Sequence, residues 1–242
     1  MEKNNKVALI TGGNKGLGKE IGRQLGKQGY IVVLTSRDRK AGEEAVAELV
    51  AAGYDAHTAQ LEVTDPNDIA KLATYLEKTF GKLDILVNNA GISLEWDGEP
   101  TNSDKIRRTL EVNLIAPYAI TEAFVPLLEK SNDARVINQS SMLGSISNAE
   151  KSWDQVATFM KAGYSTSKAG LNMLTVIQAN ELANKNILAA AAHPGWVKTD
   201  LGTDAAPMEV SEGASTVVEL ATMPRDEFPN GQLIHKGKRL PW

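Results

Sequence analysis

Two side chains able to do acid–base chemistry stand four residues apart near the middle of the chain. Tyr164 and Lys168 have i, i+4 spacing, so both side chains lie on one face of a helix. An unperturbed tyrosine has a pKa of about 10, and a nearby lysine ammonium stabilises the phenolate and lowers that pKa. Tyr164 is therefore a candidate for general acid–base catalysis near neutral pH. Taken alone, such a pair more often belongs to an exposed helix surface.

The start of the chain carries a glycine-rich turn with a second kind of chemistry. Gly12, Gly16 and Gly18 follow a short apolar run and open an amphipathic segment. Glycine lets the backbone approach a phosphate closely, and the free N–H groups of a helix start favour a pyrophosphate. The spacing differs from the common G-x-G-x-x-G fingerprint and lacks the Gly-Lys-Ser/Thr ending of a P-loop. The turn between strand and helix predicts a dinucleotide site, although the same turn also occurs without a ligand.

Composition excludes several functional classes. The chain has 242 residues with 26 Lys+Arg, 30 Asp+Glu, three His and no Cys, which gives a net charge of −4. Without cysteine there are no disulfides, thiolate nucleophiles, iron–sulfur clusters or Cys-ligated zinc sites, and the separated histidines predict no metal site. The acidic balance predicts no nucleic-acid partner, and the longest apolar stretch is far shorter than the roughly 20 residues of a membrane span. We expect a cytoplasmic protein, not bound to membranes, that borrows its reactive group from a cofactor.

Short apolar runs alternate with amphipathic segments along the whole chain. The runs are continuous, as is typical of strands covered on both faces, and the alternation indicates βαβ units with a parallel sheet. We predict an α/β fold: one Rossmann domain over residues 1–242, with a doubly wound, mostly parallel seven-stranded sheet and helices on both faces. Asp65 and Pro66 predict a helix start. The clearest strands are expected at 7–10, 31–34, 85–87, 136–137 and 187–192, and helices at 17–28, 41–52, 67–79, 103–130 and 164–184.

The glycine-rich turn and four further motifs, in the same order along the chain, resemble the short-chain dehydrogenase/reductase family. The resemblance runs from residue 7 to about residue 235. The chain is most similar to the carbonyl-reductase-like branch of the family, because of the last motif and Trp242. The four motifs are Asn88-Asn89-Ala90-Gly91, Asn113 with Ser141, Tyr164-Ser165-Thr166-Ser167-Lys168, and Pro194-Gly195-Trp196-Val197-Lys198-Thr199.

The resemblance implies a role for each residue of a catalytic group. Tyr164 is implied as proton donor, and Lys168 is implied to hold the nicotinamide ribose as well. Ser141 is implied to hydrogen-bond the substrate oxygen, with Ser140 as its competitor. Asn113 is implied to support a water-linked proton path to Lys168, although it also fits a satisfied buried amide. His193 is interpreted as structural.

The resemblance also implies a nicotinamide dinucleotide as cofactor. Two cations, Lys15 and Arg37, suit a 2′-phosphate, and Asp38 falls one residue too late for the acidic residue typical of NAD selectivity. NADPH is therefore predicted over NADH, the alternative being that both cations are solvated surface charges. Glu62 stands where the family usually has Asp, which puts that adenine contact in question. The expected cofactor-binding residues are Gly12, Asn14, Lys15, Gly16, Leu17, Gly18, Arg37, Glu62, Val63, Asn89, Ala90, Gly91, Tyr164, Lys168, Pro194, Gly195, Val197 and Thr199.

Substrate specificity is expected in three loops, at about residues 92–103, 142–163 and 199–212. The step from Ser141 to Tyr164 is 23 residues, longer than is common in the family. Aromatic and apolar side chains in these loops are interpreted either as the wall of an apolar pocket or as simple loop packing, and residues 202–208 as a mobile lid. The side chains concerned are Trp96, Trp153, Phe159, Met160 and Trp196.

These expectations combine into an NADPH-dependent reductase of an aldehyde or ketone. A secondary-alcohol or sugar-alcohol dehydrogenase working in the oxidative direction uses the same residues and remains an alternative. A non-catalytic NADP(H)-binding sensor is the alternative from another class, but it has no need of Ser141, Tyr164 and Lys168. The sequence leaves monomer, homodimer and homotetramer open.

Overall fold

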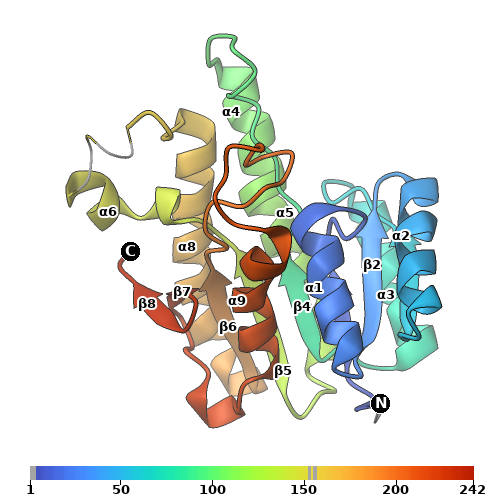
Figure 1. Ribbon diagram of the computed structural model, residues 1–242. Helices are drawn as coiled ribbons and strands as arrows, with labels where there is room; N and C mark the ends of the chain where they lie inside the picture. Colours follow the sequence, from blue (N-terminus) through green and yellow to red (C-terminus); the bar gives the residue numbers. More distant parts are fainter. Residues whose placement is uncertain (1–3, 152–153, 155–156) are drawn as a thin grey trace.

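The apolar runs of the sequence line up as neighbouring strands of one sheet, drawn in Figure 1. The computed structural model describes residues 4–151, 154 and 157–242. Strand order is β3-β2-β1-β4-β5-β6-β7-β8, so the chain reverses its direction of travel between β1 and β4. In open parallel sheets such a reversal opens a crevice at the carboxyl ends of the strands, where ligands bind. The strands are β1 (Val7–Ile10), β2 (Ile31–Ser36), β3 (Ala56–Gln60), β4 (Ile85–Asn88), β5 (Ala134–Gln139), β6 (Ile187–Ala192), β7 (Leu233–His235) and β8 (Lys238–Leu240).

The described sheet has eight strands, where seven were predicted. Strands β1 to β7 pair in parallel, and β8 pairs antiparallel with β7. The connection between them is Lys236 and Gly237, whose φ angles of 47° and 69° match the two-residue hairpin turn that requires positive φ at both positions. Each hairpin strand is only three residues long, too short for its hydrophobic pattern to separate it from a loop.

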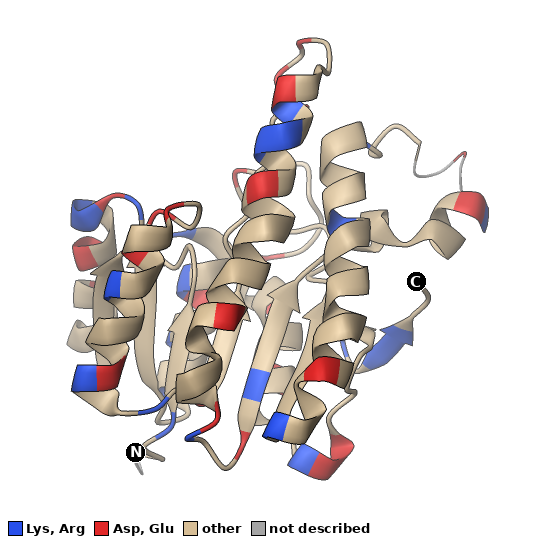
Figure 2. Ribbon diagram, turned by 180° about the vertical axis from the view of Figure 1, so that it is seen from behind, with Lys and Arg blue, Asp and Glu red and all other residues tan. Residues whose placement is uncertain are grey.

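Helices cover both faces of the sheet, as predicted. Figure 1 shows α1, α2 and α9 on the near face, and the reverse view of Figure 2 brings α5 and α8 to the front. Figure 2 also shows few charged residues along α8, consistent with a helix buried over much of its length. The helices are α1 (Gly16–Lys27), α2 (Arg39–Ala51), α3 (Pro66–Phe80), α4 (Ser103–Leu110), α5 (Ala116–Leu128), α6 (Ile146–Lys151), α8 (Ala162–Glu181) and α9 (Val210–Thr222), with short turns η1 (Glu111–Ile115), η2 (Met142–Gly144), η3 (Ala183–Lys185) and η4 (Arg225–Glu227).

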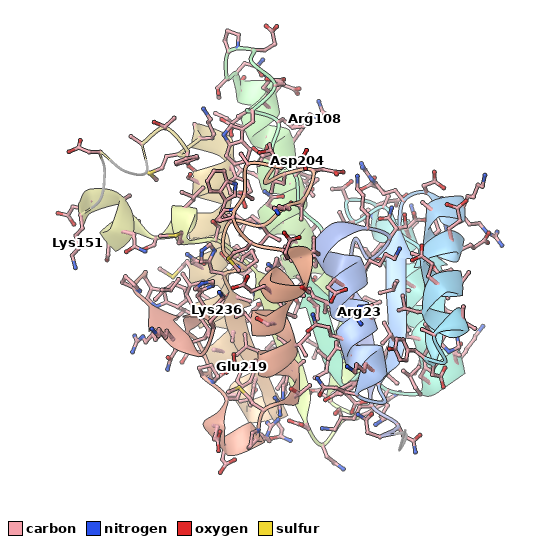
Figure 3. The ribbon with its side chains drawn as sticks, viewed as in Figure 1. Arg23, Arg108, Lys151, Asp204, Glu219 and Lys236 are labelled. Atoms are coloured by element: carbon pink, nitrogen blue, oxygen red, sulfur yellow. The ribbon has the colours of Figure 1, made fainter. Side chains whose placement is uncertain are left out.

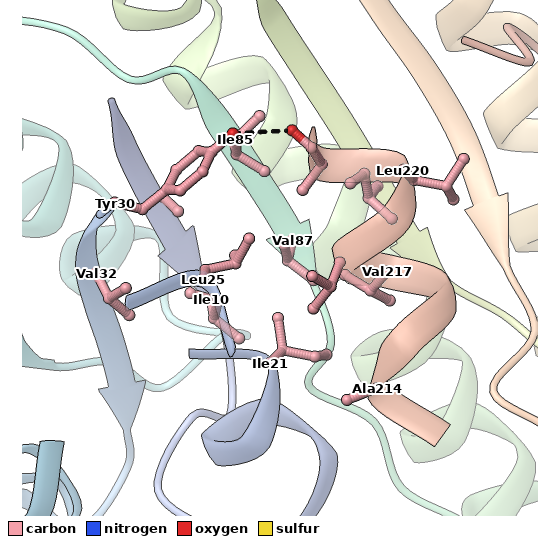
Figure 4. Packing of buried hydrophobic residues seen from close by; sticks show 14 of the residues in the cluster. Ile10, Ile21, Leu25, Tyr30, Val32, Ile85, Val87, Ala214, Val217 and Leu220 are labelled. Atoms are coloured by element: carbon pink, nitrogen blue, oxygen red, sulfur yellow. Dashed lines mark hydrogen bonds between the residues drawn. The ribbon is translucent and has the colours of Figure 1, made fainter. Parts of the chain in front are cut away.

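Two apolar cores lie between the sheet and its helical layers. In the first, Ile21 and Leu25 of α1 and Val217 of α9 meet side chains of the central strands, as Figure 4 shows. Tyr30 belongs to this core and directs its hydroxyl to the carbonyl oxygen of Ala221 at 3.2 Å, which satisfies a buried donor. The second core packs α3, α5 and α8 against the opposite face. Apolar side chains therefore cover both faces of the sheet.

The expected helix at 103–130 is interrupted. Residues Glu111–Ile115 form a π-helical turn, η1, between α4 and α5, in which the N–H of Ala116 donates to the carbonyl of Glu111. Pro117 explains the break, because proline has no N–H to donate to the carbonyl of Asn113 four residues earlier. The wider turn therefore falls at Asn113, one of the expected site residues. Turns of this kind are frequent at functional sites.

Helix α3 begins as the sequence predicted. Pro66 occupies its first position, and the Asp65 carboxylate accepts the N–H of Asn67 at 2.8 Å. Within the described residues, no helix is both long enough and apolar enough to cross a membrane.

Candidate active site

A cleft of about 910 Å³ opens at the carboxyl ends of β1, β2 and β4, the position expected from the strand order. Half of the residues expected to bind the cofactor line it. The lining residues are Gly12, Asn14, Lys15, Ser36, Arg37, Asp38, Leu61, Glu62, Val63, Thr64, Asn89, Ala90, Gly91, Ile92, Arg108, Glu111 and Val112. The other expected cofactor residues do not line this cleft: Gly16, Leu17, Gly18, Tyr164, Lys168, Pro194, Gly195, Val197 and Thr199.

The glycine-rich turn is packed directly against the segment that follows β4. Gly12 has φ +63°, and a Cβ there would lie 3.1 Å from the Cα of Ala90. A Cβ on Gly18 would overlap the carbonyl oxygen of Gly12, so neither position has room for a side chain. Asn89 braces the turn by donating its Nδ2 to the carbonyls of Thr11 at 2.8 Å and Gly12 at 3.1 Å. Thr11 in return accepts the N–H groups of Asn89 and Ala90, both at 3.0 Å.

The two cations expected to bind a 2′-phosphate differ in their surroundings. Arg37 is exposed on the cleft wall after β2. Lys15 forms an ion pair with Asp200 of the loop after β6, and both side chains are largely exposed. Asp38 caps α2 by accepting the N–H of Ala41 at 3.1 Å, which gives this carboxylate a structural partner.

Glu62 lines the cleft, but its carboxylate turns back onto its own chain. Its Oε1 accepts the hydroxyl of Thr64 at 3.0 Å and the N–H of Thr64 at 3.3 Å, while its own N–H donates to Asp68 at 3.2 Å. The next residue, Val63, is buried at the edge of the cleft.

The segment after β6 closes over the start of α1. A Cβ on Gly16 would lie 3.6 Å from Cγ2 of Thr199. A Cβ on Gly213 of α9 would contact both Val197 and Leu17, which places these two side chains side by side. Gly195 adopts φ +90° in the turn. The Pro194–Thr199 motif and the glycine-rich turn therefore face each other across one end of the sheet.

Tyr164, Ser141 and Lys168 come together outside the lining of the cleft, next to its wall residue Gly91, and all three are buried. The Tyr164 phenol hydrogen-bonds Ser141, and the Lys168 Nζ lies 5.6 Å from the Tyr164 ring centroid. Lys168 donates to the carbonyl of Gln139 at 2.8 Å. A Cβ on Gly91 would lie 3.7 Å from the Lys168 Nζ, so this lysine reaches the wall of the cleft.

Burial dominates the pKa values of this group. It raises the pKa of Tyr164 to about 12, with the Ser141 hydrogen bond acting in the opposite direction. It lowers the pKa of Lys168 to about 8. The expectation that Lys168 depresses the Tyr164 pKa is therefore wrong for this structure, because loss of water destabilises the phenolate more than its neighbours stabilise it. The Tyr164 phenol is therefore protonated at neutral pH.

The two adjacent serines have different partners. Ser140 is turned into the protein, where its hydroxyl contacts Asn172 Oδ1 at 2.5 Å and the Lys168 carbonyl at 3.4 Å. Ser141 accepts the N–H of Leu143 at 3.1 Å and faces the Tyr164 phenol. Of the two hydroxyls, it is that of Ser141 that stands beside the expected acid.

Asn113 is fully buried in η1 with both ends of its amide used. Its Oδ1 accepts the N–H of Ile92 at 2.8 Å, and its Nδ2 donates to the carbonyl of Ile92 at 2.8 Å and to Ser167 at 3.0 Å. A Cβ on Gly91 would lie 3.3 Å from Asn113 Oδ1. The amide thus holds the loop after β4 and helix α8, which carries Tyr164, to each other. The contact between Asn113 and Ser167 was not predicted from the sequence.

His193 has the surroundings of a structural residue. Its Nδ1 accepts the N–H of Met142 at 3.3 Å, its carbonyl contacts His235 at 2.9 Å, and the two imidazole rings are 4.9 Å apart. Burial, followed by the charge of His235, lowers the pKa of His193 to about 3. The ring therefore stays neutral and supports the turn after Ser141.

Aromatic side chains of the expected substrate loops form two ring pairs. The Trp96 ring lies 5.2 Å from the Tyr164 ring, and the Phe159 ring 5.5 Å from that of Trp196. Trp196 also donates its Nε1 to the Gly202 carbonyl at 2.7 Å, which ties it to the expected lid. Met160 packs near Met142 and Leu143. Trp153, also expected in this wall, lies outside the described residues.

One buried acidic residue of the site was not anticipated. Glu95, in the loop after β4, accepts backbone N–H groups from Gly163 at 3.1 Å and Tyr164 at 2.8 Å. No motif in the sequence marks it, because its partners lie 68 and 69 positions away along the chain. Among the described residues, no cluster of three His, Asp or Glu side chains is arranged to hold a metal ion.

The cleft fits a nicotinamide dinucleotide in several independent respects. Its volume is that of a cofactor site, its floor is a glycine-rich turn with no space for a Cβ at Gly12 or Gly18, and the N-terminus of α1 opens behind that turn. The fold and site together define a Rossmann-type oxidoreductase.

Comparison with known proteins gives the family. The family described as short chain dehydrogenase matches residues 6–210, and the chain belongs to it. A (+)-neomenthol dehydrogenase of Arabidopsis thaliana is 35% identical, with 95% of this chain and 96% of that protein covered. A carbonyl reductase (NADPH) 3 of Mus musculus is also 35% identical, with 95% of each chain covered. The structure of an NADPH-bound carbonyl reductase from chicken fatty liver superposes with a TM-score of 0.87, at 29% identity and 100% coverage of both chains. The predicted resemblance to the carbonyl-reductase-like branch is confirmed.

Proposed function

We propose that this protein is an NADPH-dependent reductase that converts the carbonyl of an aldehyde or ketone to an alcohol. The observation that carries the proposal is the group formed by Ser141, Tyr164 and Lys168, which lies next to Gly91 in the wall of the dinucleotide cleft. Relatives over the full chain whose names include NADPH and carbonyl reductase support the same reading.

The glycine-rich turn and the α1 N-terminus would hold the pyrophosphate. Arg37 would bind the 2′-phosphate from the cleft wall, and Lys15 would approach it from the glycine-rich turn. The Asp38 carboxylate is engaged in capping α2, which leaves the cationic residues to select the phosphorylated cofactor. Thr199 and Val197 close over the other end of the turn, where the nicotinamide would lie.

The reaction divides between the cofactor and three side chains. Bound NADPH supplies the hydride. Ser141 and Tyr164 would both hydrogen-bond the carbonyl oxygen, and Tyr164 would donate its proton to that oxygen as negative charge develops. The Lys168 ammonium, 5.6 Å from the centroid of the phenol ring, would stabilise the phenolate once it forms, and a proton from solvent would then return Tyr164 to its acid form. Asn113 keeps the loop after β4 fixed to the helix that carries both residues.

Burial raises the pKa of Tyr164 to about 12, so at neutral pH the phenol is in the protonated form that carbonyl reduction needs. Alcohol oxidation needs the phenolate as base, and a pKa of about 12 leaves very little of it at neutral pH. Reduction needs the protonated phenol, which is then the dominant form. One relative is named a neomenthol dehydrogenase. A cyclic secondary alcohol is therefore a second candidate for the alcohol that this reaction interconverts with a ketone.

Substrate choice would rest on the three loops at 92–103, 142–163 and 199–212. Trp96 contacts Tyr164 directly, and Trp196 and Phe159 contact each other. All three side chains are two-fifths or more exposed, so an apolar carbonyl compound would bury surface that is now in contact with water.

A carbonyl panel with NADPH tests the proposal. Decay of NADPH absorbance is measured for the wild type, for Tyr164→Phe, and for Tyr118→Phe as a matched control on an exposed tyrosine of α5. We expect turnover in the wild type and the control, and a loss of at least about a hundredfold in Tyr164→Phe. Equal rates in Tyr164→Phe and wild type would remove Tyr164 as the acid, and tight NADPH binding without turnover would favour a sensor.

A further inference from the structure

Glu95 is a buried carboxylate with an unusual set of partners. The residue is 5% exposed, and among the described residues no ion pair reaches it. Its Oε1 accepts the N–H of Gly163 at 3.1 Å and the hydroxyl of Thr101 at 3.1 Å, and its Oε2 accepts the N–H of Tyr164 at 2.8 Å. A buried carboxylate is tolerated only where donors replace its water. Here two of the three donors are backbone amides in the first turn of α8.

These amides need such a partner. The first N–H groups of a helix have no intrahelical acceptor, and the residue before α8, Lys161, provides no side-chain cap. Helix α3 solves the same problem locally with Asp65. In α8 the acceptor comes from a different loop, and its negative charge meets the positive end of a 20-residue helix.

The fit around this carboxylate is tight. A Cβ on Gly163 would lie 2.8 Å from Glu95 Oε2 and 3.2 Å from the Cα of Ile106, so a larger residue there would displace the carboxylate or the backbone of α4. The residue after Glu95 is Trp96, whose ring lies against that of Tyr164. One loop therefore contacts Tyr164 twice, through its backbone N–H and through its ring.

We propose that Glu95 is a positioning residue that fixes the first turn of α8, so that the Tyr164 phenol stays beside Ser141 and Trp96 stays against the phenol ring. The inference rests on the proposed function for its kinetic consequence. A shift of about 1 Å in a proton donor can reduce a rate about a hundredfold without any direct contact between the shifted group and substrate.

The test compares Glu95→Gln, Glu95→Ala and Asp65→Ala, the last removing the carboxylate cap of a helix remote from Tyr164. We expect kcat to fall about 10- to 100-fold in Glu95→Ala while the NADPH dissociation constant stays within about twofold. Glu95→Gln keeps one acceptor oxygen, so its loss should be smaller. Asp65→Ala should lower Tm by a few degrees and leave kcat within about twofold.

A spectroscopic readout makes the test independent of turnover. Ultraviolet difference titration, with each protein compared with its own Tyr164→Phe version, reports the ionisation of Tyr164 alone. In the wild type this phenol should remain protonated to beyond pH 11, in line with its pKa of about 12. In Glu95→Ala it should ionise at lower pH, because the loosened turn admits water.

Two results would overturn the inference: an unchanged Tyr164 titration in folded Glu95→Ala, or a kcat within twofold of an active wild type. If Glu95→Ala does not fold, Glu95→Gln and Gly163→Ala are judged by the same two criteria. A wild type that reduces no carbonyl would refute the proposed function, and the Tyr164 titration would then decide the positioning role alone.

Discussion

The amino group of Lys168 lies 5.6 Å from the Tyr164 ring centroid and donates its hydrogen bond to the carbonyl of Gln139, not to the phenol. Both side chains are buried, which raises the pKa of Tyr164 to about 12 and lowers that of Lys168 to about 8. At neutral pH Tyr164 is therefore a neutral phenol and Lys168 is mostly a charged ammonium. The residue whose charge changes in the accessible pH range is Lys168.

The pH profile of carbonyl reduction should follow this lysine. Below about pH 8 the ammonium is present and stabilises the phenolate that forms on proton donation; above it the neutral amine cannot. We expect kcat to be level below pH 8 and then to fall about tenfold per pH unit. The Lys168→Arg side chain keeps its charge beyond pH 12, so the fall in kcat above pH 8 should disappear in this variant, even if its kcat is lower at every pH. A wild-type profile that stays level to pH 10 would contradict this assignment.

Cofactor preference should depend on Arg37 more than on Lys15. Charge-assisted hydrogen bonds to a phosphate contribute about 1.5–3 kcal/mol, so Arg37→Ala should reduce the preference for NADPH over NADH about 10- to 100-fold in kcat/KM. Lys15 already pairs with Asp200, and Lys15→Ala should have the smaller effect. Arg39→Ala is the control, since this neighbouring arginine is exposed and pairs with Glu43. An unchanged preference in Arg37→Ala would rule out its phosphate role.

The contact between Trp196 and the lid should control binding of apolar substrates. Trp196→Phe removes the Nε1 hydrogen bond to Gly202 and keeps an aromatic ring near Phe159. We expect KM for a bulky apolar ketone to rise about three- to tenfold, and more in Trp196→Ala, with kcat little changed. A small polar aldehyde provides the control substrate. An equal rise in KM for both compounds would contradict an apolar wall.

The free energy of unfolding should decrease at acidic pH because of His193. Burial lowers its pKa in the folded protein to about 3, below the value of about 6.5 in the unfolded chain. The folded state therefore resists protonation, and this contribution is complete above pH 6.5 and lost as pH falls towards 3. At pH 5 the loss amounts to about 2 kcal/mol, or a Tm lower by several degrees.

His193→Gln should flatten that dependence between pH 6.5 and 5, while remaining less stable than the wild type at pH 7. His57→Gln provides the control, since His57 is a partly exposed histidine on β3. Thermal unfolding at several pH values makes the measurement. Parallel curves for His193→Gln and the wild type would show that the imidazole is not the titrating group.

The parts of the site that sequence predicted are those built from local chain geometry. Gly12 and Gly18 lie in a tight turn where a Cβ would be crowded. Tyr164 and Lys168 share a helix face, which their four-residue spacing already predicts. Asn113 was placed near the site, but the π-helical turn that carries it depends on Pro117 and on packing against the loop after β4.

Other features depend on contacts between distant segments. Glu95 reaches Tyr164 across 69 positions, and Lys15 reaches Asp200 across 185. The pKa of Tyr164 was predicted in the wrong direction because the sequence shows its lysine neighbour, whereas the dominant effect is the exclusion of water by the whole fold. The β7–β8 hairpin was not predicted as two strands, because a strand of three residues is too short to show a hydrophobic pattern.

The π-helical turn η1 also limits how this chain can change in length. Each residue of an α-helix turns the chain by about 100°, and the wide turn at Glu111–Ile115 takes up one residue that regular geometry does not accommodate. A single-residue deletion inside α4 or α5 has no such turn to take up the change, and it would rotate the chain on one side of it by about that angle. In α5, a deletion ahead of Ile120 and Phe124 would turn these two side chains from the sheet towards water. Changes in length should therefore be tolerated in the loop before α4, and selected against inside the two helices that flank η1.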